Sequence, residues 1–258
     1  MPALAIVSAL LDEQRGLLEQ LSQTSKHTRA GRTFWRGKWG EQDVVLVLSR
    51  VGKVAAASTA TTLIEAFGVG IILFTGVAGG LGEGVAVGDV VVAREFIQHD
   101  MDSSPLFERF EIPLYGRARL PCDGHLTDIL LEASKLGLES AGSHFHRENL
   151  IHAPQVHFGL IASGDQFVSS AEAVAELLQS LGNAGHMPLA VEMEGAAIAQ
   201  VCFDYGVPFA AMRTVSDRAD DDAHVDFSAF VQQVASPYAL AIVREFMHLL
   251  RQSHLPLP

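Results

Sequence analysis

The chain has 258 residues, of which 48% are hydrophobic, so it is long enough to bury the core of one large domain. Asp and Glu outnumber Lys and Arg by 30 to 18, and the formal charge of −12 argues against long-range attraction to nucleic acid or to an anionic membrane. These numbers favour a small or neutral ligand as the partner.

The amino-terminal segment combines an apolar stretch with two acids. Leu4 to Ala9 has the length of a strand, and a helical pattern of leucines follows Asp12 and Glu13. Glu13 is therefore expected at the start of a helix, just after a strand. No basic n-region precedes the apolar residues, and no stretch reaches ~18 uninterrupted apolar residues. We expect a cytoplasmic protein that does not span a membrane.

A hairpin, a helix and a glycine-rich loop are predicted next. Thr33 to Trp39 and Val44 to Ser49 bracket a turn, and Gly52 to Phe67 has the composition of an Ala-rich helix. Gly70 to Thr75 is predicted as a strand that continues into GVAGGLGEGVAVGD, a loop whose backbone can approach a ligand closely. No GxGxxG spacing occurs in it, and the GKV that begins at Gly52 lacks the flanking residues of a P-loop, so both nucleotide-binding motifs are excluded.

The middle of the chain contains a strand, a long irregular segment and a helix. Val90 to Gln98 is predicted as the strand, residues 101–121 are rich in aromatics and prolines and should wrap over another part of the chain, and Leu126 to Leu136 is predicted as the helix. A polar loop follows, and it contains His144, His146 and His152. A structural metal site would require fixed ligand spacing and a companion acid or thiolate, so we expect solvated histidines and no metal.

The last third of the chain continues the alternation of strands and helices. His157 to Ser163 is predicted as a strand that ends in the turn GDQFV, and Ser169 or Ser170 can cap the helix that follows. Residues 227–250 carry apolar side chains at helical spacing and close one flank. Strands that alternate with helices from end to end predict an α/β fold, in which residues 1–258 form a single-domain three-layer α/β/α sandwich.

The stretch from Leu189 to Asp217 places acids next to apolar segments. It reads as a strand, a helix from Gly195 to Tyr205 that ends at Gly206, and a second strand that ends in Ser216-Asp217. Glu194 and Asp217 are thus expected at the ends of two neighbouring strands, where open α/β sheets bind ligands. The alternative is that Glu192 and Glu194 form only the solvated end of a strand.

Three acids, Glu13, Glu194 and Asp217, therefore follow predicted strands. Cleavage of an N-glycosidic bond requires an acid to protonate the leaving base, a base to activate water and a group to hold the sugar. Three carboxylates can fill these roles. The chain has no GxSxG, HExxH or kinase signature, which removes the most common competing chemistries.

Six motifs occur together in order: SALLDEQ, GKVAAA, TGVAGGLGEGVAVGDVVVA, SGDQF, VEMEGAAIA and VPFAAMRTVSD. In this set the chain resembles the 5'-methylthioadenosine/S-adenosylhomocysteine nucleosidases of the purine nucleoside phosphorylase superfamily. The likeness covers about residues 4 to 250 and is weakest between 101 and 155. It implies a nucleoside phosphorylase-like fold with a mixed, twisted central sheet, an adenine nucleoside as the substrate, and no cofactor.

The resemblance also implies roles for individual residues. Glu13 matches the water-activating base, Asp217 the acid that protonates adenine at N7, and Glu194 the residue that holds the ribose hydroxyls. The other positions implied around the substrate are Leu10, Val77, Ala78, Gly79, Phe167, Val168, Glu192, Met193, Arg213, Ser216 and Phe227. Met193 should pack on the sugar, Phe167 should stack on adenine, the main chain of Val168 should read the base edge, and Ser216 should orient Asp217.

Some of these residues also have ordinary structural explanations, and two depart from the family pattern. Phe167 and Phe227 could be core aromatics, and Arg213, expected near Glu13, could be the partner in a structural ion pair. Many relatives have Met where this chain has Leu10, and Ser where it has Val77. Loss of that hydroxyl removes a hydrogen bond typically worth ~1 kcal/mol, which puts substrate preference in doubt and leaves the reaction class intact.

Three other functions remain open from the residues. A phosphorylase would need a cationic or hydroxyl group to hold phosphate, whereas Asp12 and Glu13 would repel it. A nucleosidase for aminodeoxyfutalosine, or for another adenine nucleoside with a bulky 5' group, would use the same acids. A non-catalytic nucleoside-binding relative is disfavoured by the presence of all three acids.

The segment from Met101 to Pro121 predicts a homodimer. An apolar patch is expected here, and such patches usually mark an interface; its members are Leu106, Phe107, Phe110, Ile112, Pro113, Leu114 and Tyr115. The resemblance implies a symmetric dimer in which Phe107 and Pro113 of the partner subunit enclose the 5' group. The alternative is a segment that folds back on its own subunit as a lid.

Overall fold

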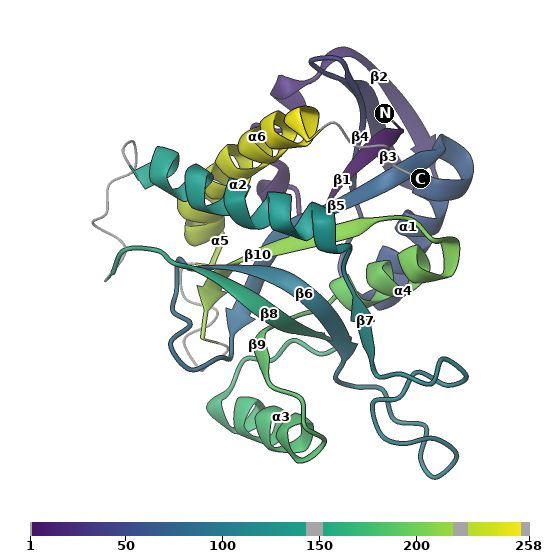
Figure 1. Ribbon diagram of the computed structural model, residues 1–258, viewed down its shortest axis with the longest axis vertical. Helices are drawn as coiled ribbons and strands as arrows, with labels where there is room; N and C mark the ends of the chain where they lie inside the picture. The colour runs from purple at the N-terminus through teal and green to yellow at the C-terminus, as the bar shows by residue number, and fades with distance from the viewer. Residues whose placement is uncertain (1, 143–151, 219–226, 254–258) are drawn as a thin grey trace.

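The computed structural model describes residues 2–142, 152–218 and 227–253, and helices alternate with strands over most of this length (Figure 1). The strands are β1 (Ala3–Ser8), β2 (Ser22–Arg29), β3 (Arg32–Trp39), β4 (Gln42–Leu48), β5 (Val69–Gly80), β6 (Val90–Gln98), β7 (Arg119–Pro121), β8 (Val156–Ser163), β9 (Pro188–Glu192) and β10 (Phe209–Asp217). The helices are α1 (Lys53–Phe67), α2 (Gly124–Gly142), α3 (Ala171–Asn183), α4 (Gly195–Tyr205), α5 (Phe227–Phe230) and α6 (Ser236–Gln252).

The central sheet is mixed, as the family resemblance implied. Its strand order is β10-β6-β8-β9-β5-β1-β4-β3-β2, and β7 pairs with β6. β1 runs parallel to β4 and β5, and β5 runs parallel to β10, whereas β9 joins β5 and β6 joins β10 in antiparallel pairs. Because β10 pairs with β5 as well as with β6, five strands close into a ring. The expectation that β9 and β10 are neighbours is wrong, since β5 lies between them.

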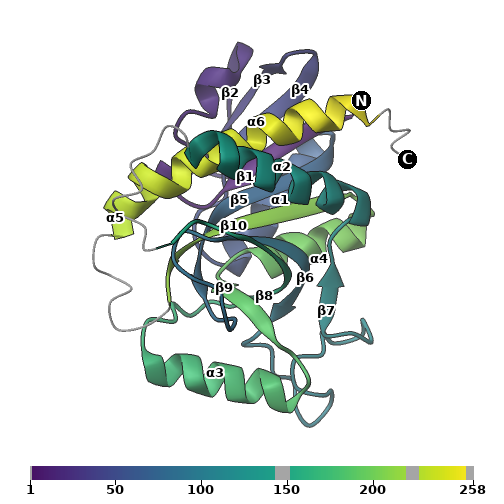
Figure 2. The same cartoon turned by 60° about the vertical axis from the view of Figure 1, so that its left-hand side comes forward.

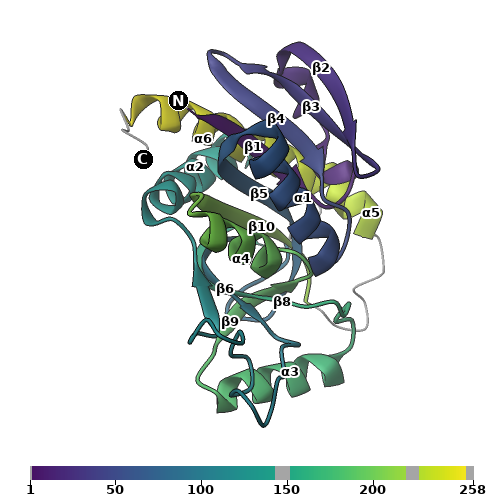
Figure 3. The same cartoon turned by 90° about the vertical axis from the view of Figure 1, so that its right-hand side faces the viewer.

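Two helical layers cover the sheet, which confirms the three-layer sandwich. α1 and α4 pack together on one face, and α2 and α6 pack together on the other (Figures 1 and 3). Alternation along β1 explains how the faces form: Ala5 and Val7 belong to the core under α1 and α4, whereas Leu4 and Ile6 belong to the core under α2 and α6. Figure 2 shows α3 apart from both layers, near β8 and β9. Among the described helices, none has the length and apolar character needed to cross a membrane.

Several element boundaries differ from the sequence-based prediction. The residues after β1 form two short 3-10 turns, Asp12–Gln14 and Leu18–Gln20, instead of one helix. Gly16 interrupts them at φ +82°, a conformation that favours glycine, and packs tightly on Leu240. β5 extends to Gly80, so the first five residues of the predicted glycine loop, 76–80, are strand. The exposed strand β2 carries no apolar alternation and was not predicted.

The helix ends follow the predicted signals more closely. Ser170 is the N-cap of α3, and its hydroxyl accepts from the Ala173 amide at 3.2 Å. Gly206 ends α4 in the left-handed conformation. The predicted helix from Phe227 to Leu250 is present in three parts, α5, a π-helical turn and α6, with the π turn at Val231–Ala235.

The prediction of solvated histidines is wrong for His152; His144 and His146 lie outside the described residues. The buried carboxylate of Asp89 accepts hydrogen bonds from His152 Nε2 at 2.9 Å and from His157 Nε2 at 2.7 Å. Two backbone amides, those of Ala86 and Gln155, complete the set. A buried carboxylate requires such partners, and a sequence pattern does not reveal His152, Gln155 and His157 because they lie more than 60 residues away from Asp89.

The predicted apolar patch on residues 101–121 is smaller than expected. Phe110 and Ile112 are buried within their own chain, and the Tyr115 hydroxyl donates to Asp204 of α4 at 2.6 Å. Leu106 and Leu114 remain 85% and 90% exposed. The base of the segment therefore folds onto its own chain, and its tips present apolar side chains to the outside.

Candidate active site

The carboxyl ends of β1, β5, β9 and β10 surround a cavity of about 190 Å³. Its lining includes most of the sequence-predicted site residues, namely Leu10, Glu13, Val77, Ala78, Gly79, Phe167, Val168, Glu192, Met193, Glu194, Ser216, Asp217 and Phe227. Four lining residues were not predicted: Ala9, Val51, Gln166 and Val191. Three predicted residues, Arg213, Phe107 and Pro113, are not part of the lining.

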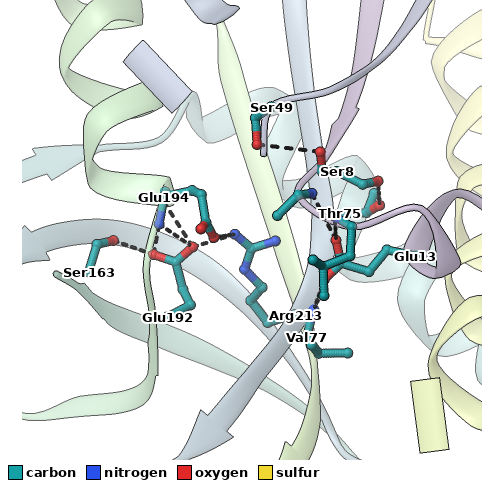
Figure 4. Close-up of polar contacts among 12 residues, drawn as sticks. Ser8, Glu13, Ser49, Thr75, Val77, Ser163, Glu192, Glu194 and Arg213 are labelled. Carbon is teal, nitrogen blue, oxygen red and sulfur yellow. Dashed lines mark hydrogen bonds and ion pairs between the residues drawn. The ribbon is translucent and has the colours of Figure 1, made fainter. Parts of the chain in front are cut away.

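Glu13 enters the cavity from the 3-10 turn after β1. It is 4% exposed, and its Oε2 accepts from the backbone amides of Ala9 and Leu10, both at 2.8 Å. Its Oε1 accepts from the Val77 amide at 3.1 Å (Figure 4). Burial raises the pKa of Glu13 above its ordinary value, and the Arg213 charge and the backbone amides oppose that rise. The side chain is thus fixed in direction and poised to take up a proton.

Arg213, on β10, does not line the cavity and lies between Glu13 on one side and Glu192 and Glu194 on the other (Figure 4). It is 1% exposed and its guanidinium lies 3.7 Å from the centre of the Phe74 ring. Nη2 donates to Glu192 and lies 3.9 Å from Glu194 Oε2. Arg213 therefore forms the structural ion pair that was the alternative to a role near Glu13. It also faces Glu13, and its positive charge lowers the pKa of Glu13.

Gly76 explains how Arg213 and Glu13 come so close. A Cβ at this position would lie 2.6 Å from Nη1 of Arg213 and 2.8 Å from Oε1 of Glu13. Neither group can move away, since one is buried in an ion pair and the other is held by three backbone amides. The glycine of the TGVAGG motif therefore leaves room for both charged groups.

Both carboxylate oxygens of Glu192 accept hydrogen bonds from groups of the same chain. They accept from the Ser163 hydroxyl, from the backbone amides of Glu194 and Gly195 at 2.9 to 3.1 Å, and from Arg213. The amides belong to the first turn of α4, where a negative charge is favourable. Gly195 allows this turn to sit against Phe96, because a Cβ there would lie 2.1 Å from the ring.

Glu194 is the N-cap residue of α4 and is 5% exposed, so the alternative of a solvated strand end is wrong. Its Oε1 accepts from the Gly52 amide at 2.9 Å, at the start of α1. Burial, followed by the nearby charge of Glu192, raises the pKa of Glu194 to about 8. One buried guanidinium cannot neutralise Glu13, Glu192 and Glu194 at once, so a proton is retained on Glu194 near neutral pH.

Asp217 lies across the cavity, at the end of β10. The Ser216 hydroxyl donates to its Oδ2 at 2.7 Å, which orients the carboxyl group. Phe167 and Val168 line the same cavity from the loop after β8; the Phe167 side chain is 52% exposed, so it is not a core aromatic. The site thus has a carboxyl group on either side and an aromatic ring at its rim.

Comparison with known proteins agrees with this geometry. The model of the phosphorylase superfamily matches residues 3–248. The chain belongs to this superfamily. It is 35% identical, over 88% of its own length and 90% of the relative's, to a 5'-methylthioadenosine/S-adenosylhomocysteine nucleosidase of Exiguobacterium.

Solved structures of superfamily members superpose over nearly the whole chain. One is a 5'-methylthioadenosine/S-adenosylhomocysteine nucleosidase from Neisseria meningitidis in complex with methylthio-immucillin-A, with a TM-score of 0.81, 34% identity and coverage of 96% of this chain and 99% of that one. Another is a futalosine hydrolase of Helicobacter pylori, with a TM-score of 0.81, 30% identity and coverage of 96% and 98%. The fold and the order of the motifs are thus those of nucleosidases in the phosphorylase superfamily.

The site residues that sequence analysis missed carry weak signals. Ala9, Val51 and Val191 are small or branched apolar residues that resemble ordinary core residues, although Val51 is 50% exposed. Gln166 lies inside the predicted GDQFV turn and could have been found there. Gly52 contributes only a backbone amide, which no residue pattern reports.

Proposed function

We propose that this superfamily member hydrolyses the N-glycosidic bond of 5'-methylthioadenosine and S-adenosylhomocysteine, and releases adenine and the 5-thio-substituted ribose. One observation carries the proposal. The buried or half-buried carboxyl groups of Glu13, Glu194 and Asp217 converge on one cavity at the ends of strands. The rest of the cavity lining is mostly apolar and aromatic, which suits a nucleoside. The names of the relatives and solved structures support the same reaction.

In this mechanism the three acids divide the work. Asp217 donates a proton to N7 of adenine, so the base takes up the electron pair of the breaking C1'–N9 bond and leaves as neutral adenine. Glu13 takes a proton from water as the water oxygen attacks C1', where positive charge develops. Glu194 binds the ribose hydroxyls, and its retained proton gives it a donor as well as an acceptor.

The neighbouring groups support these assignments. The Ser216 hydroxyl holds Asp217 in direction, and the three backbone amides that bind Glu13 leave its carboxylate without rotational freedom. The Arg213 charge lowers the pKa of Glu13 against the effect of burial, which favours the ionised form that a general base requires.

Hydrolysis fits this cavity better than phosphorolysis. None of the described residues that line it is a lysine or an arginine, and the buried guanidinium of Arg213 is already paired with Glu192. A phosphate dianion would meet the carboxylate of Glu13 without a compensating cation. Water is neutral and is favoured as the nucleophile.

Futalosine-type nucleosides are a second candidate class, because solved structures of a futalosine hydrolase match this chain as well as those of methylthioadenosine nucleosidases do. The cavity opens past Val51 and Phe167, which are 50% and 52% exposed, so its rim has room for a larger 5' group. The three acids would act on the glycosidic bond in the same way.

One assay separates these functions. Purified protein is incubated with 5'-methylthioadenosine, S-adenosylhomocysteine, aminodeoxyfutalosine or inosine, with and without phosphate, and the release of free base is followed. We expect adenine from the first two at the same rate with and without phosphate, and a 5-thio-substituted ribose that carries no 1-phosphate. A strict phosphate requirement would show a phosphorylase, and turnover of aminodeoxyfutalosine alone would show the second candidate class.

We further propose that the chain acts as a symmetric homodimer that completes each site. Large apolar side chains lie exposed on two regions: Leu11 and Val54 near the cavity, 75% and 81% exposed, and Leu106 and Leu114 on the tips of the 101–121 segment. A monomer would leave these side chains in water. Phe107 and Pro113 do not line the cavity of their own chain, which fits a role around the 5' group of the partner's site.

Sedimentation velocity tests the dimer, and Phe107→Ala tests the shared site. We expect a dimer, and we expect the variant to lose part of its preference for 5'-methylthioadenosine over adenosine, since adenosine lacks the alkylthio group. A monomer, or an unchanged preference in Phe107→Ala, would support the alternative in which the segment serves only its own subunit.

A further inference from the structure

Three charged residues from separate parts of the chain meet beside the cavity and have no part in the proposed chemistry. Lys53, from GKVAAA, donates from Nζ to Asp100 Oδ1 at 2.6 Å. The other oxygen of Asp100 accepts from the backbone amide of Asp165, from SGDQF, at 2.9 Å. Asp165 Oδ1 in turn accepts from the backbone amide of Lys53 at 2.7 Å. Lys53, Asp100 and Asp165 therefore form a closed triangle of hydrogen bonds, which we call the Lys53 triad.

The Lys53 triad touches the two structural elements that support opposite parts of the site. Asp165 lies two residues before Phe167, in the loop whose Gln166, Phe167 and Val168 line the cavity. Lys53 begins α1, directly after Gly52, whose amide holds Glu194 at 2.9 Å. The loop that contains Phe167 and the side chain of Glu194 are thus connected through three residues that do not line the cavity themselves.

Partial burial makes these contacts stronger than ordinary surface ion pairs. The side chains of Lys53 and Asp100 are 16% and 22% exposed, whereas an exposed pair would be screened by solvent. Burial opposes ionisation of Asp100, yet its pKa lies below the ordinary value because of the Lys53 amine and the Asp165 amide. Lys53 Nζ also donates to Gln98 at 3.0 Å, and Gln98 is 6% exposed.

The loop has little freedom to adopt another position while the triad is intact. Gly164 lies against the buried His99 ring, and a Cβ on Gly164 would lie 2.2 Å from Nε2 of that ring. The Gly164 amide also donates to the Glu192 carbonyl at 3.1 Å. Gly52 has a φ of +98°, and a Cβ there would lie 3.1 Å from Asp165 Oδ1, so α1 approaches the loop at a residue that must be glycine.

We propose that the Lys53 triad is a positioning unit. It fixes the loop that contains Phe167 and Val168 relative to the Gly52–Glu194 contact, so that base and ribose are bound together. This inference rests on the proposed function, in which Phe167 and Val168 contact the base and Glu194 contacts the ribose. The triad does not touch the reacting atoms, so it sets substrate affinity more than the rate of bond cleavage.

The test replaces the amine and keeps the length of the side chain. Lys53→Met should raise the KM for 5'-methylthioadenosine about tenfold and change kcat less than about twofold. The dissociation constant of adenine, measured by calorimetry, should rise about tenfold as well, because adenine reports on the loop without any turnover. Lys53→Arg should restore most of the affinity, since a guanidinium can still donate to Asp100.

Lys38→Met is the matched control. Lys38 forms an ion pair of similar length, 3.0 Å, with Asp43 on the strands β3 and β4, and its side chain is 34% exposed. Its loss should leave KM, kcat and the adenine dissociation constant unchanged. Asp100→Asn provides a second variant of the triad, and the double variant Lys53→Met with Asp100→Asn should cost less than the sum of the two single changes.

Three results would overturn the proposal. The first is an adenine dissociation constant that Lys53→Met and Asp100→Asn both leave at the wild-type value. The second is a fall in kcat and melting temperature with KM unchanged, which would mark a purely structural role. The third is strict additivity in the double variant. Because adenine binding is measured apart from turnover, a wild type that binds adenine but releases none from nucleosides would contradict only the proposed function.

Discussion

The carboxylate of Glu192, at the end of β9, is as buried as those of Glu13, after β1, and Glu194, at the start of α4, but it is held in a different way. A carboxylate has about four acceptor sites. Glu192 accepts from the Ser163 hydroxyl, two backbone amides and Arg213, which fills these sites. Glu13 accepts from three backbone amides, and Glu194 from one amide with Arg213 3.9 Å away. A saturated carboxylate is part of the scaffold, whereas one with spare acceptor capacity can bind water or a hydroxyl group.

The largest effect on kcat is expected at Glu13, which lines the cavity and can accept a further hydrogen bond. Glu13→Gln should lower kcat by about 10²- to 10⁴-fold, because an amide cannot take a proton from water. Steady-state adenine release measures kcat, and circular dichroism checks that the fold is intact. Glu19→Gln, on the exposed side of the same segment, is the control and should behave as wild type. Wild-type turnover in Glu13→Gln would contradict the assignment of the base.

Glu192 should show the opposite pattern, in which substitution affects the free energy of unfolding more than kcat. Glu192→Gln removes the charge that faces buried Arg213, and breaking a buried pair costs about 3–5 kcal/mol. Urea unfolding at neutral pH should show a loss of this order in the free energy of unfolding, larger than that in Glu13→Gln. Equal stability of the two variants would remove the distinction between a saturated and an unsaturated carboxylate.

Glu194 should make stability depend on pH. Burial and the charge of Glu192 raise its pKa from 4.5 to about 8, so the folded chain retains a proton that the unfolded chain releases. This contribution to stability is complete below the unfolded pKa and is lost as the pH rises through the folded pKa. The free energy of unfolding of the wild type relative to Glu194→Gln should therefore fall between about pH 4.5 and 8. Urea titrations across this window measure the difference, and a pH-independent difference would contradict the raised pKa.

The smallest effect is expected at Ser216, which acts on Asp217 through one hydrogen bond. Ser216→Ala removes the 2.7 Å bond to Oδ2 and should lower kcat by about fivefold to tenfold, the change that ~1 kcal/mol produces. Stability should change little, because Ser216 is only half-buried. A loss as large as that in Glu13→Gln would mean that Ser216 contacts the substrate itself.

The amino-acid sequence by itself determined the chain of elements and the identity of the acids. Continuous apolar segments such as β1 and glycine stops such as Gly206 are local signals, because side-chain burial and backbone conformation act within a few residues. The motifs around Glu13, Glu194 and Asp217 placed acids directly after strands, and strand ends are where this class of sheet binds ligands.

Only the tertiary structure decided which acid is scaffold and which is free to bind substrate. Glu192 and Glu194 are two residues apart and of the same type, and they differ because Ser163 and Arg213 reach one and the Gly52 amide reaches the other. Glu194 and Gly52 are separated by 142 residues in the chain, as Lys53 and Asp165 are by 112. Contacts over such distances come from the strand order β8-β9-β5-β1-β4, which places the residues after β4 on the same sheet as those after β8 and β9, and no local pattern of residues encodes that order.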